Sequence, residues 1–164
     1  MVRSYWRYMV LLGVMVVMIP FAVRAQGVDN RRIGFGVNLG EPIGFDGRLY
    51  FTDQFLLDLV VGYGFSEEAF IIQPSLLIPL RGILDYDAPR YSLVPYFGAG
   101  FKTGVVLSGH DDGEGVAAFR FPIGTTWVMK EGRFELSVEF APGVEFNPDE
   151  GFDATGGLGL RYFF

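Results

Sequence analysis

Residues 155–164, TGGLGLRYFF, form the stretch that decides the fold of this chain. Successive side chains of a β-strand point to opposite faces. One face of this strand is therefore apolar and ends in aromatic rings, since it carries Leu158, Leu160, Tyr162 and Phe164. The other face is small and cationic, with glycines beside Arg161. A last strand that is apolar outward and polar inward indicates the closing strand of a transmembrane β-barrel.

The same alternation of apolar with small or polar residues recurs in seven earlier stretches. They span residues 33–39, 43–51, 55–65, 72–80, 93–102, 117–127 and 134–141. Eight strands of about ten residues match the length that a tilted membrane strand needs. We predict an all-β fold, an eight-stranded antiparallel up-and-down transmembrane β-barrel with its longest polar loops at 103–115 and 144–153. Four prolines, each of which removes a ladder donor, interrupt this pattern: Pro74, Pro95, Pro122 and Pro142.

The polarity of the predicted barrel has two interpretations. A soluble, exported β-barrel or sandwich would turn the apolar face inward. Its exterior would then be the opposite face, which consists mainly of glycine and other small residues with about one charge per strand. That is too little polarity for a surface in water, whereas the apolar face carries no charge at all. The pattern favours lipid outside and a narrow, charge-paired lumen inside.

Residues 1–25 have the anatomy of a secretory signal peptide. Arg3 and Arg7 precede an apolar stretch at 9–23, and Val23-Arg24-Ala25 resembles a cleavage site. An uncleaved membrane anchor is the alternative, but the apolar part is short for a spanning helix. The absence of cysteine excludes a lipoprotein anchor, disulfides and thiol chemistry. We expect residues 26–164 to form the barrel domain.

The charge of the expected mature chain excludes some classes of partner. Residues 1–25 contain three of the 13 basic residues and none of the 19 acidic ones, so residues 26–164 have a net charge of −9. This charge argues against nucleic-acid binding and against attachment to anionic lipid by charge alone.

The signal peptide, the eight alternating segments, VPYFGAGFK at 94–102 and LGLRYFF at 158–164 together resemble a small outer-membrane barrel of the OmpA/OmpX type. The resemblance covers the whole expected mature chain. It implies location in the outer membrane of a Gram-negative cell. We expect a monomer in outer-membrane lipid and no cofactor. The resemblance also implies that the barrel-assembly machinery recognises the last strand through Leu158, Leu160, Tyr162 and Phe164. We expect the barrel domain alone, because the peptidoglycan-binding domain of longer relatives has no counterpart after Phe164.

The strand assignment directs eight ionisable side chains into the lumen. Four acids face four bases: Asp46, Asp58, Glu135 and Glu139 against Arg48, Lys102, Arg120 and Arg161. An unpaired charge in a narrow lumen is costly, so this balance predicts mutual pairing. The interpretation we favour is a structural plug, because an eight-stranded barrel is just wide enough for its own side chains. The alternative is a narrow, cation-favouring pore.

The predicted outer loops hold ten acidic residues and no Lys or Arg. Two hypotheses explain this excess equally well. The first is that the charges keep the exposed loops soluble. The second is that they form a rim that binds divalent cations, because carboxylate oxygens suit Ca²⁺ and Mg²⁺. Its candidate residues are Asp111, Asp112, Glu114, Asp149, Glu150 and Asp153.

Catalysis has one weak candidate. His110 is the only histidine and Ser108 lies two residues before it, which resembles part of the Ser, His and acid group of barrels that deacylate lipid A. Both lie in a glycine-flanked loop rather than on a strand, so we expect no enzyme activity. The sequence predicts an integral outer-membrane barrel with a structural or surface-interaction role. A lipid-modifying enzyme ranks third, after the pore.

Overall fold

The structure is a computed structural model that describes residues 31–84, 86–107, 113–129, 133–147 and 150–164. The described part of the chain contains no helix that is long and apolar enough to cross a membrane. Its elements are strands: β1 (Ile33–Glu41), β2 (Ile43–Tyr50), β3 (Leu56–Gly64), β4 (Ala69–Pro79), β5 (Tyr86–Asp87), β6 (Tyr91–Val106), β7 (Gly115–Arg120), β8 (Ile123–Met129), β9 (Phe134–Asn147) and β10 (Gly151–Phe163).

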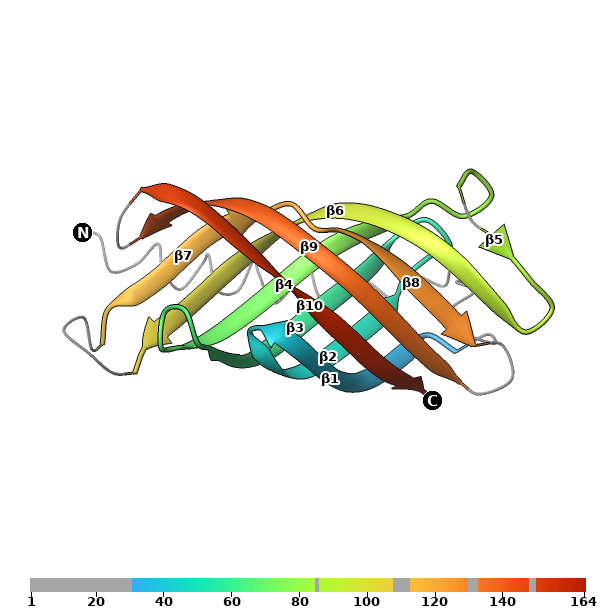
Figure 1. Cartoon of the computed structure of the whole chain (residues 1–164), viewed down its shortest axis with the longest axis horizontal. Helices are drawn as coiled ribbons and strands as arrows, with labels where there is room; N and C mark the ends of the chain where they lie inside the picture. Colours follow the sequence, from blue (N-terminus) through green and yellow to red (C-terminus); the bar gives the residue numbers. More distant parts are fainter. Residues whose placement is uncertain (1–30, 85, 108–112, 130–132, 148–149) are drawn as a thin grey trace, which may run out of the picture.

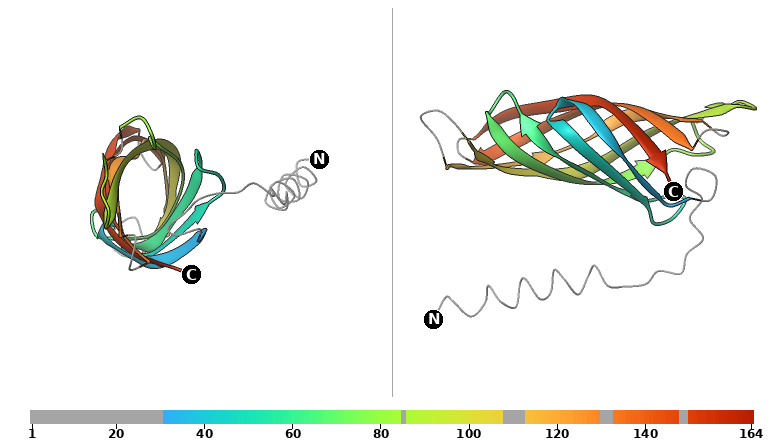
Figure 2. Two further views of the ribbon diagram at one scale, coloured as in Figure 1. Left: turned by 90° about the vertical axis from the view of Figure 1, so that its right-hand side faces the viewer. Right: turned by 90° about the horizontal axis from the view of Figure 1, so that it is seen from below.

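These strands form a closed antiparallel barrel with eight strand positions around the ring, and we call each position a stave. Each main strand pairs with its neighbour in the chain, and β10 pairs with β1, from Gly34 opposite Phe163 to Glu41 opposite Gly156. β7 and β8 together form one stave, since both lie between β6 and β9. The two-residue β5 only extends the edge of β6. Figure 1 shows the tilted strands side by side, and the left view of Figure 2 shows the closed ring. The predicted eight-stranded antiparallel fold is confirmed.

Three predicted boundaries were wrong, all for the same physical reason. Residues 103–106 belong to β6, residues 144–147 to β9, and residues 151–154 to β10. Backbone pairing continues through these stretches, as in Val105 opposite Gly115 and Phe152 opposite Val144. Since ladder hydrogen bonds are made by the backbone, polar or glycine-rich sequence does not end a strand that has partners on both sides.

Proline interrupts one stave. The predicted strand 117–127 is divided at Phe121-Pro122, and the backbone there is still bound on both sides. The N–H of Phe121 donates to the carbonyl of Pro142, and that of Gly98 to the carbonyl of Pro122. The ladder therefore tolerates proline where the proline carbonyl accepts a hydrogen bond from an N–H of the neighbouring strand.

Burial in this barrel is the inverse of that in a soluble protein. Phe45 is 79% exposed on the outside, and Lys102 and Glu135 are 0% exposed on the inside. The faces predicted from the alternation agree with this arrangement on every stave. A continuous apolar exterior of this kind is far larger than the exposed patches of soluble monomers.

Apolar side chains close the interior near both ends. We call the end where β1 begins and β10 finishes the terminal end, and the opposite end the loop end. Near the terminal end lies a cluster of Tyr50, Leu56, Leu77, Tyr96, Val128 and Phe163. Near the loop end lies a smaller one of Ala69, Ile71, Val106 and Val116. The charged residues lie between these two layers.

Candidate functional site in the barrel interior

The register of the strands brings the central charges together. Arg48 on β2 lies opposite Asp58 on β3, and Arg161 on β10 lies opposite Glu135 on β9. Gly36 on β1 pairs with Arg161 on one side and with Asp46 on the other. Because Gly36 has no side chain, Arg161 reaches across β1 to Asp46. All five ionisable side chains are at most 3% exposed.

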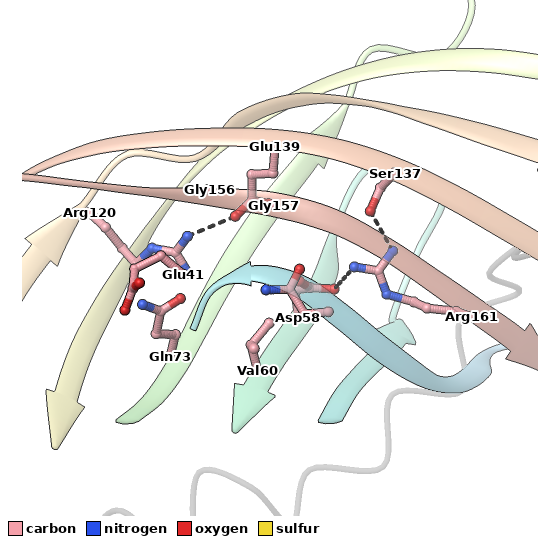
Figure 3. Close-up of a pocket in the computed structure, with 11 residues that line it drawn as sticks. Glu41, Asp58, Val60, Gln73, Arg120, Ser137, Glu139, Gly156, Gly157 and Arg161 are labelled. Atoms are coloured by element: carbon pink, nitrogen blue, oxygen red, sulfur yellow. Dashed lines mark hydrogen bonds and ion pairs between the residues drawn. The ribbon is translucent and has the colours of Figure 1, made fainter. Parts of the chain in front are cut away.

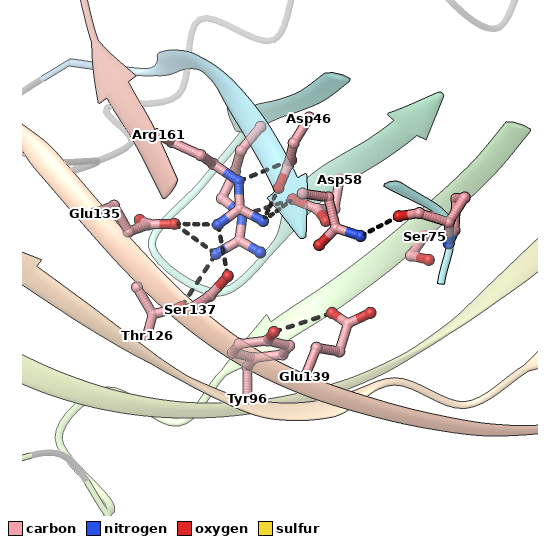
Figure 4. A network of polar contacts seen from close by, with 12 residues as sticks. Asp46, Asp58, Ser75, Tyr96, Thr126, Glu135, Ser137, Glu139 and Arg161 are labelled. Atoms are coloured by element: carbon pink, nitrogen blue, oxygen red, sulfur yellow. Dashed lines mark hydrogen bonds and ion pairs between the residues drawn. The ribbon is translucent and has the colours of Figure 1, made fainter. Parts of the chain in front are cut away.

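Two guanidinium groups hold three carboxylates in this central network (Figure 4). Arg48 Nε lies 2.6 Å from Asp58 Oδ1, and Arg48 Nη1 lies 2.6 Å from Glu135 Oε1. Arg161 Nη2 lies 2.6 Å from Asp46 Oδ2, and Arg161 Nη1 lies 3.0 Å from the same Glu135 oxygen. Charge-assisted bonds of this length are the strong kind. Glu135 therefore joins both arginines.

Neutral groups add hydrogen bonds to the network. The hydroxyl of Tyr50 donates to Glu135 Oε2 at 2.7 Å, while Arg48 donates to Thr126 and Arg161 donates to Ser137. Two buried atoms of the network, Arg48 Nη2 and Asp46 Oδ2, have no hydrogen-bond partner among the described residues, although Asp46 Oδ2 lies in an ion pair with Arg161.

A second group lies closer to the loop end. Arg120 Nη2 donates to Glu139 Oε1 at 2.8 Å, and the Tyr96 hydroxyl donates to Glu139 Oε2 at 2.9 Å. Beside it is a cavity of about 10 Å³, about the size of one water molecule. Glu41 and Gln73 line this cavity together with Arg120, as Figure 3 shows. Glu41 Oε1, Gln73 Nε2 and Arg120 Nε are buried there without a protein hydrogen-bond partner.

A third group surrounds Lys102, which is 0% exposed. Its ammonium donates to Glu67, from the β3–β4 turn, and to Asp153 Oδ1 on β10 at 2.9 Å. Asp153 was predicted to lie on the outer rim, but the structure places it inside the mouth of the barrel, where it is 9% exposed. The reason is the extension of β10, which makes residue 153 an inward-facing strand position.

The predicted balance of four acids and four bases was wrong for the described residues. All eight predicted lumen residues lie inside the barrel, and four further acids, Glu41, Glu67, Glu145 and Asp153, join them. Among the described residues, eight interior acids therefore face four bases. Alternation along strands could not reveal Glu67, which enters from the β3–β4 turn, or Glu41, which ends β1 at a position that the alternation assigns to the outward face.

The remaining predicted residues have separate positions. Glu114 and Glu150 are exposed at the loop end, whereas Asp111, Asp112 and Asp149 lie outside the described residues. Ser108, His110 and the expected signal peptide at 1–25 also lie outside them. The proposed assembly residues Leu158, Leu160, Tyr162 and Phe164 point outward, and the Tyr162 ring makes edge-to-face contacts with Phe134 and Phe164.

The fold and the interior define the structural class of this protein. It is a closed eight-stranded antiparallel β-barrel with an apolar exterior and an ion-paired interior. No protein-family model, curated protein or solved structure matches the chain.

Proposed function

We propose that the chain is an integral outer-membrane β-barrel protein, with its apolar exterior in lipid and a structural or surface-interaction role. One observation carries the proposal, namely the inversion of burial. Large apolar side chains from every stave are exposed, and the central arginines and carboxylates are buried. A closed barrel of this polarity suits a lipid environment, since every strand has two neighbours and no edge remains unpaired.

The interior supports a plug rather than a channel. Two apolar layers enclose the ion pairs, and the cavity between Arg120 and Gln73 has room for about one water molecule. The outer-membrane location belongs to the same proposal and rests on the resemblance to small OmpA/OmpX-type barrels. We also propose a monomer without enzyme activity, because the one weak catalytic pair, Ser108 and His110, lies in a predicted loop. A narrow cation-favouring pore is the second candidate, because eight interior acids against four bases among the described residues would favour cations.

The proposal is tested by cell fractionation combined with gel migration. We expect the protein in the outer-membrane fraction, resistant to extraction by carbonate, and with a faster migration on a detergent gel before heating than after it. Recovery as a soluble periplasmic protein with one migration position would overturn the proposal.

A further inference from the structure

Three acidic side chains meet beside Lys102 near the loop end of the interior. Glu67, Glu145 and Asp153 come from the β3–β4 turn, β9 and β10, and one carboxylate oxygen of each lies within 4.8 Å of those of the others. β9 and β10 are paired here, with Glu145 opposite Gly151 and Gly143 opposite Asp153. Paired strands therefore fix the positions of two of the three acids.

The charge of this cluster is not balanced by its own lysine. The Lys102 ammonium pairs with two of the three carboxylates, those of Glu67 and Asp153, and the Glu145 carboxylate lies within 4.8 Å of both. Carboxylates this close repel one another strongly away from bulk water.

Oxygen atoms without partners provide an independent observation. Asp153 is 9% exposed and its Oδ2 has no hydrogen-bond partner. Glu67 Oε2 also has no hydrogen-bond partner. Thr155 is 4% exposed, and its hydroxyl is also without a partner. Thr155 lies two residues from Asp153 on the same inward face of β10, so both side chains point into this part of the interior. A buried polar atom normally has a partner.

We propose that Glu67, Glu145 and Asp153 bind a hard divalent cation, Ca²⁺ or Mg²⁺, inside the loop end of the barrel, with Thr155 as a further oxygen donor. Carboxylate and hydroxyl oxygens are the ligands that these ions prefer. A divalent cation adds positive charge where acids outnumber the one lysine. The Glu67 side chain is 22% exposed at the loop end.

The test is a calcium and magnesium titration of the purified, folded protein in a nonionic detergent. Unfolding by urea is followed with and without the metal salt, against sodium chloride at equal ionic strength. We expect saturable stabilisation in the wild type. Asp153→Asn and Glu145→Gln should each weaken the apparent affinity by about tenfold or more, because ligand charge sets the affinity of such sites. Heat-modifiable migration shows whether each variant has folded.

Two comparisons make the result decisive. Glu114→Gln and Glu150→Gln, on exposed carboxylates at the same end, should leave the metal response unchanged. Lys102→Gln should strengthen it, since it removes a positive charge from the site. The inference is overturned if the wild type shows no saturable response, or if the exposed variants abolish the response and Asp153→Asn does not. Neither outcome bears on membrane insertion, which fractionation tests separately.

Discussion

At the scale of single residues, Arg161 is the side chain that contacts all three carboxylates of the central network. Its guanidinium contacts Asp46, Glu135 and, at 3.5 Å, Asp58, and it is 3% exposed. Buried carboxylates without a counter-charge are costly, so the arginine and its acids are stable only as a group.

Arg161→Met should therefore lower the free energy of unfolding by about 3–5 kcal/mol, because three buried acids would face Arg48 alone. Urea unfolding in detergent micelles measures the loss. Arg133→Met is the matched control, because Arg133 is exposed and its side chain donates only at 3.2 Å to the Tyr162 hydroxyl. Equal stability of the two variants would contradict the network described here.

Gly159 is the residue that leaves space for the Arg161–Asp46 pair. A Cβ atom there would lie 2.6 Å from Ser137 Oγ and 2.8 Å from both Arg161 Nη2 and Asp46 Oδ2. We expect Gly159→Ala to cost about 1–3 kcal/mol through overpacking. Gly151→Ala is the control, since a Cβ at that position meets nothing within 4 Å. A Gly159→Ala protein as stable as the control would show that the pair can move aside.

At the scale of elements, the closing strand β10 directs alternate side chains to the outside and to the interior of the barrel. Leu160 lies outward opposite Val37, at the middle of β1, and is 45% exposed. The same strand directs Arg161 and Phe163 inward, where both are buried.

Leu160→Lys distinguishes lipid from water outside the barrel. In lipid vesicles, a lysine near the midplane should destabilise the fold by about 2–4 kcal/mol. Gln54→Lys, in the exposed turn after β2, should have little effect. Unchanged folding of Leu160→Lys in vesicles would argue against the proposed membrane exterior.

The elements also show what sequence can and cannot predict here. Period-two alternation identified the faces of all eight staves, because in this barrel one face is apolar and the other holds the glycines and charges. It misplaced the ends of β6, β9 and β10, since residues such as Gly104 and Asp153 resemble a loop until their pairing partners are known. It directed eight charges inward but could not place Glu67, because the reach of a turn side chain depends on the shape of the barrel end. It could not place Glu41 either, because this last residue of β1 lies at an outward position in the alternation.

At the scale of the whole molecule, two apolar layers enclose a hydrogen-bonded, charged centre. Arg81 lies over the Tyr50 ring at 5.3 Å, which adds the β4–β6 connection to the closure of the terminal end. A path for ions would have to pass Tyr50, Leu77 and Phe163 at one end and Ile71 and Val116 at the other.

We therefore expect no steady conductance in planar bilayers. Each layer presents apolar groups to an ion that would lose its hydration shell. Steady open levels that change with Asp46→Asn, Asp58→Asn or Arg120→Ala would establish the pore instead. A barrel of known conductance, reconstituted in the same bilayer, shows that insertion has occurred.

The contact of Arg161 with Asp46 across Gly36 has a consequence for the order of folding. These residues are 115 positions apart, and only the seam between the last and first strands brings them together. An open sheet that lacks β10 holds Asp46, Asp58 and Glu135 with Arg48 as their one central counter-charge. The barrel thus reaches charge compensation only in the step that also joins its ends, so closure is favoured as an all-or-none event rather than by gradual zipping.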